Sequence, residues 1–133
     1  MSEMHRLQLT RLKENIDRRR KIVSKIKEKL QAIDEITVLA EDKHGRSNYS
    51  YFGIYVPDPF ALSDYLSQNG FDSCPQEYYD CASLDQFSEF ASTCDRARYA
   101  SQHLLRLPNY LRMRDSDVNN MISVIDTFFA KNY

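Results

Sequence analysis

The first quarter of the chain carries a hydrophobic pattern with helical spacing. Between residues 4 and 33, apolar residues recur at alternating steps of three and four, and Lys, Arg, Glu and Gln fill most other positions. This seam consists of Leu9, Leu12, Ile16, Val23, Ile26, Leu30 and Ile33, with Arg19 at one position where an apolar residue is expected. Because the segment holds neither glycine nor proline, the pattern predicts one long amphipathic helix, Met4 to Ile33, whose stripe is buried against another surface.

Short strand and helix patterns follow in residues 34–133. The clearest strand is Tyr49 to Val56, which is rich in aromatic and β-branched residues; Gly53 within it indicates a bulge or a close approach of another backbone. Asp58 is placed to cap a helix that begins at Pro59 and stops at Gly70. Further strands are predicted near residues 36–39, 71–74 and 105–107, and short helices near 84–90 and 95–104.

The last predicted element is a helix capped by Asp115 or Ser116. Together the elements predict an α+β fold, with a small antiparallel or mixed sheet of three or four strands covered by helices. We expect one domain over residues 1–133, made of a long basic amphipathic helix (1–33) and an α+β body (34–133). The expected core contains Tyr51, Ile54, Val56, Leu62, Leu66, Leu105, Leu107, Val118, Ile122 and Ile125.

Charge is divided unevenly although the formal net charge is only -1. Residues 1–33 hold ten Lys or Arg against four Asp or Glu, and the remainder is acidic. The run from Arg18 to Lys21 spreads its charges around most of a helical cylinder, which suits a nucleic-acid groove poorly. An amphipathic membrane helix would carry bulkier aromatic residues on its apolar face. The pattern therefore disfavours nucleic acid and membranes, and favours contact with the acidic remainder of this or another subunit.

Residues that could carry catalysis or bind a metal are scarce. The three cysteines, Cys74, Cys81 and Cys94, form no C-x-x-C pair, and with His103 they match no common zinc spacing. None of the histidines lies in a recognisable nucleophile context, and no glycine-rich phosphate loop occurs. We therefore expect no catalytic, cofactor-binding or metal-binding residue in this chain, and reduced thiols in the cytoplasm.

Tyr78 and Tyr79 lie in the segment whose pattern is least regular. Amphipathic rings of this kind commonly contact a ligand or a partner at the edge of a domain. They are the candidate substrate-edge or partner contacts; the alternative, which the sequence favours, is that they simply close the edge of the domain.

The order of these elements resembles the C-terminal small domain of the DegT/StrS family of sugar aminotransferases, which have fold type I. The matching segments are the arginine-rich helix LKENIDRRRKIVSKIKEKL, the strand YSYFGIYV, the helix end from Leu66 to Phe71, and the segment HLLRLPNYLRMRDSDVNNMISVID. The resemblance spans nearly the whole chain. It implies the same α+β small domain.

Family members of this kind transfer an amino group to a keto-sugar nucleotide, using pyridoxal phosphate (PLP) bound to a lysine of the large domain. No lysine here fits that role, since most lie on the basic helix. The family also carries a Tyr-x-x-Pro-Leu-His segment near the substrate, whereas the nearest equivalent here, residues 77–84, lacks the proline and the histidine. The resemblance therefore predicts an isolated or truncated small domain, inactive alone, that completes or binds a partner subunit; the alternative is a non-enzymatic adaptor that docks through its basic helix.

The predicted N-terminal helix is also long for the body that must cover it. A helix of this length spans about 45 Å, whereas a body of this size has a radius of gyration near 13 Å. Part of the stripe should overhang and form an interface, with either a second copy or a separate PLP-binding large domain. The expected interface residues are Leu9, Leu12, Ile16, Arg19 and Val23.

Overall fold

The computed structural model describes residues 3–75, 78–90 and 94–132. Its N-terminal segment forms two helices, α1 (Glu3–Thr10) and α2 (Leu12–Leu30), where the sequence predicted one. Arg11 separates them in a tight turn: its N–H donates to the Gln8 carbonyl at 3.2 Å, and the Thr10 hydroxyl donates to the Leu7 carbonyl at 2.7 Å. Side-chain bonding of this kind competes with the regular helical bonds, which accounts for the break.

Four short strands form one antiparallel sheet in the order β1-β2-β4-β3. They are β1 (Thr37–Val38), β2 (Phe52–Tyr55), β3 (Cys74–Pro75) and β4 (Leu104–Leu107). The central pair, β2 and β4, runs in unbroken register from Phe52↔Leu107 to Tyr55↔Leu104, so Gly53 forms no bulge. A Cβ at Gly53 would lie 2.8 Å from Leu104 Cδ1, so the approach that favours glycine comes from a side chain. The α+β prediction with a small sheet is confirmed.

One face of the sheet holds the core. Phe52, Ile54 and Leu105 are buried, and alternation along a strand directs their sequence neighbours to the other face. Tyr51 was expected in the core but is 61% exposed, because it has the opposite parity to Phe52 and Ile54. Ile122 was also expected there and is only partly buried against the core.

Helices α2, α3 (Pro59–Gln68) and α5 (Asp115–Asn132) supply most of the remaining core residues. The Asp58 carboxylate accepts from the Ala61 N–H at 2.9 Å, as the sequence predicted for a cap. Gly70 ends α3 at a φ of 81°, a conformation that glycine adopts without strain. At α5 the capping bond comes instead from Asp117, whose carboxylate accepts from the Arg114 N–H at 2.9 Å.

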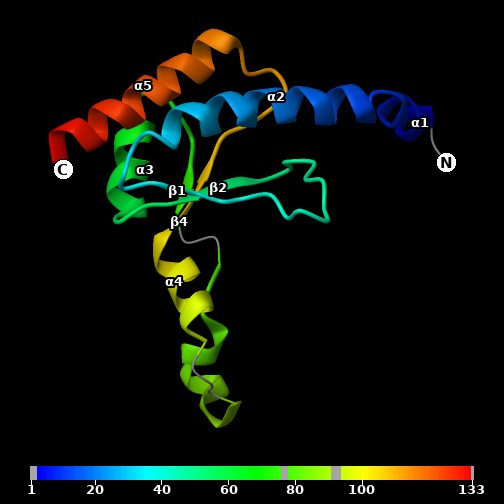
Figure 1. Ribbon diagram of the computed structural model, residues 1–133. Helices are drawn as coiled ribbons and strands as arrows, with labels where there is room; N and C mark the ends of the chain where they lie inside the picture. The colour runs from blue at the N-terminus through cyan, green and yellow to red at the C-terminus, as the bar shows by residue number, and fades with distance from the viewer. Residues whose placement is uncertain (1–2, 76–77, 91–93, 133) are drawn as a thin grey trace.

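Residues 81–90 and 94–103 extend away from the helical layer as an arm on the other side of the sheet (Figure 1). The arm contains the 3-10 turns η1 (Cys81–Ser83) and η2 (Asp85–Phe90), followed by helix α4 (Asp95–His103). Tyr99 of α4 contacts Tyr55 of β2 edge-on, with ring centroids 5.2 Å apart. In the part of the chain that the structure describes, no helix is both long and apolar enough to cross a membrane.

Candidate functional site

The apolar stripe of the N-terminal helices divides into a buried and an exposed half. Val23, Ile26 and Leu30 are fully buried among α5 and the sheet residues of the core. At the other end of the stripe, Leu9 and Leu12 are 57% and 50% exposed, and Ile16 is half-buried. This exposed N-terminal part, Leu9, Leu12 and Ile16, is called the overhang below. Figure 1 shows α1 and the start of α2 reaching well beyond the other helices.

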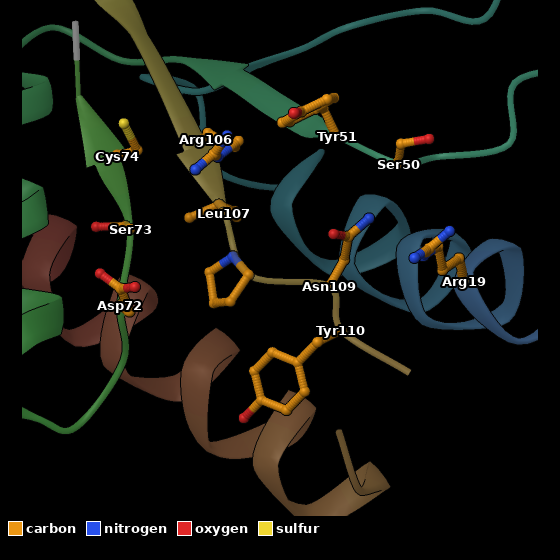
Figure 2. A pocket seen from close by; sticks show the side chains of 11 residues that line it. Arg19, Ser50, Tyr51, Asp72, Ser73, Cys74, Arg106, Leu107, Asn109 and Tyr110 are labelled. Carbon is orange, nitrogen blue, oxygen red and sulfur yellow. The ribbon is translucent and has the colours of Figure 1, made fainter. Parts of the chain in front are cut away.

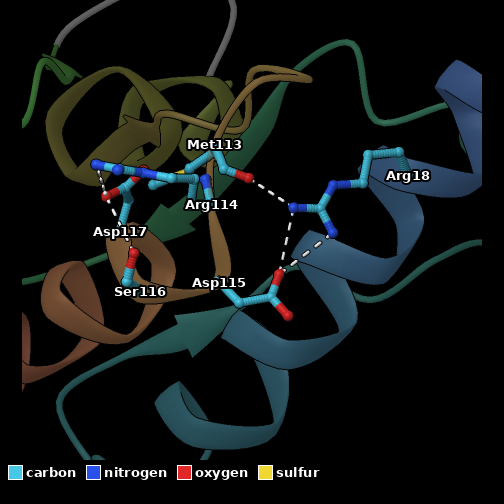
Figure 3. A network of polar contacts seen from close by, with 6 residues as sticks. All are labelled: Arg18, Met113, Arg114, Asp115, Ser116 and Asp117. Atoms are coloured by element: carbon cyan, nitrogen blue, oxygen red, sulfur yellow. Dashed lines mark hydrogen bonds and ion pairs between the residues drawn. The ribbon is translucent and has the colours of Figure 1, made fainter.

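Arg18 marks the boundary between the two halves. Its guanidinium donates to the Met113 carbonyl at 2.6 Å and to the Asp115 carboxylate at 3.2 Å, which attaches α2 to the start of α5 (Figure 3). Met113 is itself fully buried. The beginning of α5 is therefore fixed to α2 at this residue, and the overhang lies on its N-terminal side.

The loop between β1 and β2 lies against the same helix. The Glu41 carboxylate accepts from Arg20 at 2.6 Å and from the Ser47 backbone N–H. The N–H bond from Ser47 is the main reason why the pKa of Glu41 is lowered, and the positive charge of Arg20 adds to it. Tyr49 closes the network, because its ring faces the Lys27 ammonium at 5.2 Å from the centroid.

A groove of about 570 Å³ separates this loop from the overhang. Leu12 and Ile16 supply its apolar wall, and Arg46 and Asn48 lie on the loop side. An apolar surface held between a fixed helix and a fixed loop suits the docking of another protein surface.

The other predicted contact residues lie elsewhere. Val23 is buried in the chain's own core and therefore offers no surface to a partner. Arg19 is half-buried and lines a depression at the end of the sheet. Tyr78 and Tyr79 are 56% and 68% exposed and directly precede the arm in the sequence.

Lys27 has an amine that is bonded within the chain, and its surroundings do not fit a cofactor lysine. Its ammonium donates to the Leu39 carbonyl at 2.9 Å and to the Tyr49 hydroxyl at 3.2 Å. Both bonds tie the Lys27 amine to groups of the chain's own fold, whereas a Schiff-base lysine needs an amine that is free to react with the cofactor carbonyl. Glu41, the nearest acid, is already occupied by Arg20 and Ser47. Within the described residues, no cluster of His, Cys, Asp or Glu has a geometry that could hold a metal.

Sequence reasoning missed two residues that organise this region. Asn109 is 8% exposed, and its amide donates to the Tyr49 carbonyl at 2.6 Å, joining the segment after β4 to the loop before β2. Arg106 lies over the ring of Tyr51 at 5.0 Å from the centroid. The sequence does show two polar residues, Arg106 and Asn109, at the end of the Leu-x-Leu-Pro strand. Their partners, Tyr51 and Tyr49, lie more than 50 residues earlier, so the sequence pattern does not reveal the contacts.

Comparison with known proteins gives one family and a consistent set of folds. The model of the DegT/DnrJ/EryC1/StrS aminotransferase family matches residues 2–126. No curated protein sequence matches significantly.

Among solved structures, the aminotransferase TlmJ from Streptoalloteichus hindustanus is 22% identical, with a TM-score of 0.83 over 94% of this chain and 34% of that chain. DesV from S. venezuelae is 15% identical, with a TM-score of 0.84 over 93% of this chain and 34% of that one. A DegT/DnrJ/EryC1/StrS aminotransferase from Brucella abortus is 18% identical, with a TM-score of 0.79 over 92% of this chain and 33% of that chain. At these identities the likeness shows the fold, and the chain spans about a third of the length of each of these proteins.

Proposed function

The chain belongs to the DegT/DnrJ/EryC1/StrS aminotransferase family, and on that premise we propose that it is the small-domain part of an aminotransferase that works only with a separate PLP-binding large domain. Its fold superposes on about a third of each related enzyme, which supports a part that is completed by another. In this proposal the cofactor lysine comes from the large domain, and the Lys27 amine serves this chain's own fold through its bonds to the Leu39 carbonyl and the Tyr49 hydroxyl.

The observation that carries the proposal is the exposure of the overhang. Leu9 and Leu12 expose about half of their side chains, although the same stripe is fully buried from Val23 onward. Arg18 and Glu41 fix the helix and the adjoining loop, so the groove between them is preorganised for docking. In this proposal the large domain occupies this surface. The assembled enzyme then transfers an amino group to a sugar.

The test begins with the coding sequence next to this chain in its genome. A large domain with a PLP lysine encoded there is co-expressed with the chain, with an affinity tag on the large domain only. We expect the two to co-purify. Changing both Leu12→Ser and Ile16→Ser should abolish the complex, because burying apolar surface drives association of this kind.

The matched control is Leu84→Ser with Phe87→Ser, a pair of exposed residues on the arm. This control variant should co-purify as the unchanged chain does. The absence of any such large domain, or a complex that survives the overhang substitutions, would contradict the proposal. In that case the alternative of an adaptor docking through its basic helix would be preferred.

A further inference from the structure

The sheet is covered by helices on one face only. Helices α2, α3 and α5 pack on the face that holds the core, and the arm lies beyond the opposite face (Figure 1). This opposite face, called the outer face below, carries Tyr51, Tyr55, Cys74, Leu104 and Arg106. A solvated face of an antiparallel sheet normally carries polar residues, whereas in this set Arg106 alone is charged.

Strand β2, together with Tyr51 just before it, is apolar on both faces. Phe52 and Ile54 are buried in the core, and Tyr51 and Tyr55 have the opposite parity. A run of this kind, in which both parities are apolar, is typical of strands that are covered on both faces. Tyr51 is nevertheless 61% exposed. The strand therefore has the composition of a doubly covered strand, and its outer side is open at Tyr51.

A depression of about 710 Å³ lies over the open part of the outer face, with Tyr51, Cys74 and Arg106 in its lining (Figure 2). Arg106 of β4 pairs with Cys74 of β3, and its guanidinium lies 5.0 Å from the centroid of the Tyr51 ring. The sheet beneath holds these side chains in place. A fixed, concave surface that presents an aromatic ring suits contact with another protein.

This depression continues the groove beside the overhang. Ile16 lines the groove and Arg19 lines the depression, and the two residues lie about one turn apart on α2. On the loop side, Asn48 lines the groove and Ser50 lines the depression, and the Asn48 side chain accepts from the Ser50 N–H at 2.9 Å. A partner seated in the groove is therefore within reach of the outer face.

We propose that the outer face is the second half of the surface that docks the separate large domain, with Tyr51 and Cys74 buried beneath it. This inference rests on the proposed function, and it extends the contact from the overhang across the loop to the sheet. The chain spans about a third of each related enzyme, so the part that completes it is the larger one and can cover both areas.

The first test measures how fast Cys74 and Cys81 react with iodoacetamide, with peptide mass spectrometry as the readout. The chain alone, at a concentration where it is monomeric, is compared with the complex co-purified with the large domain. Cys74 should react at least about ten-fold more slowly in the complex, because a covered thiol is shielded from the reagent. Cys81, which is exposed on the arm, is the internal control and should change less than about two-fold.

The second test uses a matched pair of variants. Tyr51→Ser should weaken the complex about ten-fold, because a tyrosine buried at an interface commonly contributes at least this much. The control is Phe60→Ser, which removes an aromatic residue that is 52% exposed on α3 and should change the affinity less than about two-fold. Sedimentation velocity gives the concentration at which each complex dissociates, and circular dichroism checks that both variants are folded.

Three outcomes would overturn the inference. They are a Cys74 that reacts as fast in the complex as in the free chain, equal weakening by Tyr51→Ser and Phe60→Ser, and equal protection of Cys74 in the concentrated chain without the large domain, which would assign the face to a second copy. An absent complex overturns the proposed function as well, and it is recognised at the co-purification step. A stable complex with a reactive Cys74 removes only the inference about the outer face.

Discussion

The Glu41 carboxylate shows how a single residue fixes the position of a loop. It joins Arg20 of α2 to the Ser47 backbone and lies 3.4 Å from the Tyr49 hydroxyl. The Ser47 N–H, followed by the charge of Arg20, lowers the pKa of Glu41 below its ordinary value of 4.5. A carboxyl group whose pKa is lower in the folded state stabilises that state above its unfolded pKa, and this contribution is lost as the pH falls through the folded value.

Glu41→Gln should therefore reduce the acid sensitivity of the protein. We expect the thermal midpoint of the variant to lie below that of the unchanged chain at neutral pH, and the gap to narrow as the pH falls below 4.5. The pKa of Asp117 is also lowered, mainly by its bond from the Arg114 side chain, so some acid sensitivity should remain. Calorimetry across this pH range measures the gap, with Glu28→Gln on the exposed side of α2 as control. A gap that stays constant with pH would contradict the assignment.

Helix α5 provides a test of the core at the scale of one element. Ile125 is fully buried, whereas Ile122, three residues earlier, only packs against the edge of the core. An unpaired buried charge costs about 3–5 kcal/mol, and a small domain is stable by about 5–15 kcal/mol. Ile125→Asp should therefore remove a large part of the stability, and Ile122→Asp should cost clearly less because its charge can reach water.

Urea unfolding followed by circular dichroism compares the two variants directly. Equal destabilisation by both, or a folded Ile125→Asp protein with an unchanged midpoint, would show that the face of α5 is assigned wrongly.

Elements with local signals were predicted well from the sequence. Asp58 caps α3 and Gly70 ends it because both effects depend on residues within one helical turn. The break at Arg11 depends on the hydroxyl bond of Thr10, which the helical periodicity does not reveal. Tyr51 was misplaced because β-propensity identified the strand but not which parity faces the core.

The candidate sites were less predictable, since they depend on contacts distant in sequence. The interruption of the seam by Arg19 was visible in the sequence, but the depression that it shares with Arg106 exists only after α2 and β4 are brought together. Likewise, the exposure of Leu9 and Leu12 follows from where the α2–α5 contact ends at Arg18. The length of the helix predicted an overhang, and the fold shows which residues form it.

The whole molecule has its helical layer on one face of the sheet, an arm beyond the other, and the overhang extending from one end (Figure 1). Without a large domain, the overhang exposes Leu9 and Leu12 to water together with part of Ile16. Two copies can cover these surfaces with each other, because a two-fold axis places the same apolar patch on both sides of the interface. Basic residues that surround the overhang repel each other in such a pair, so the association should strengthen with salt.

Sedimentation velocity over a range of concentrations tests this self-association. We expect the unchanged chain to form dimers at high concentration, and the variant with Leu9, Leu12 and Ile16 changed to Ser to remain monomeric, because its apolar contact area is lost. The control variant carries Tyr78→Ser, Leu84→Ser and Phe87→Ser on the other exposed apolar region and should dimerise like the unchanged chain. A strictly monomeric unchanged chain would contradict the prediction. A dimer that survives the overhang substitutions but not the control substitutions would place the interface on the arm.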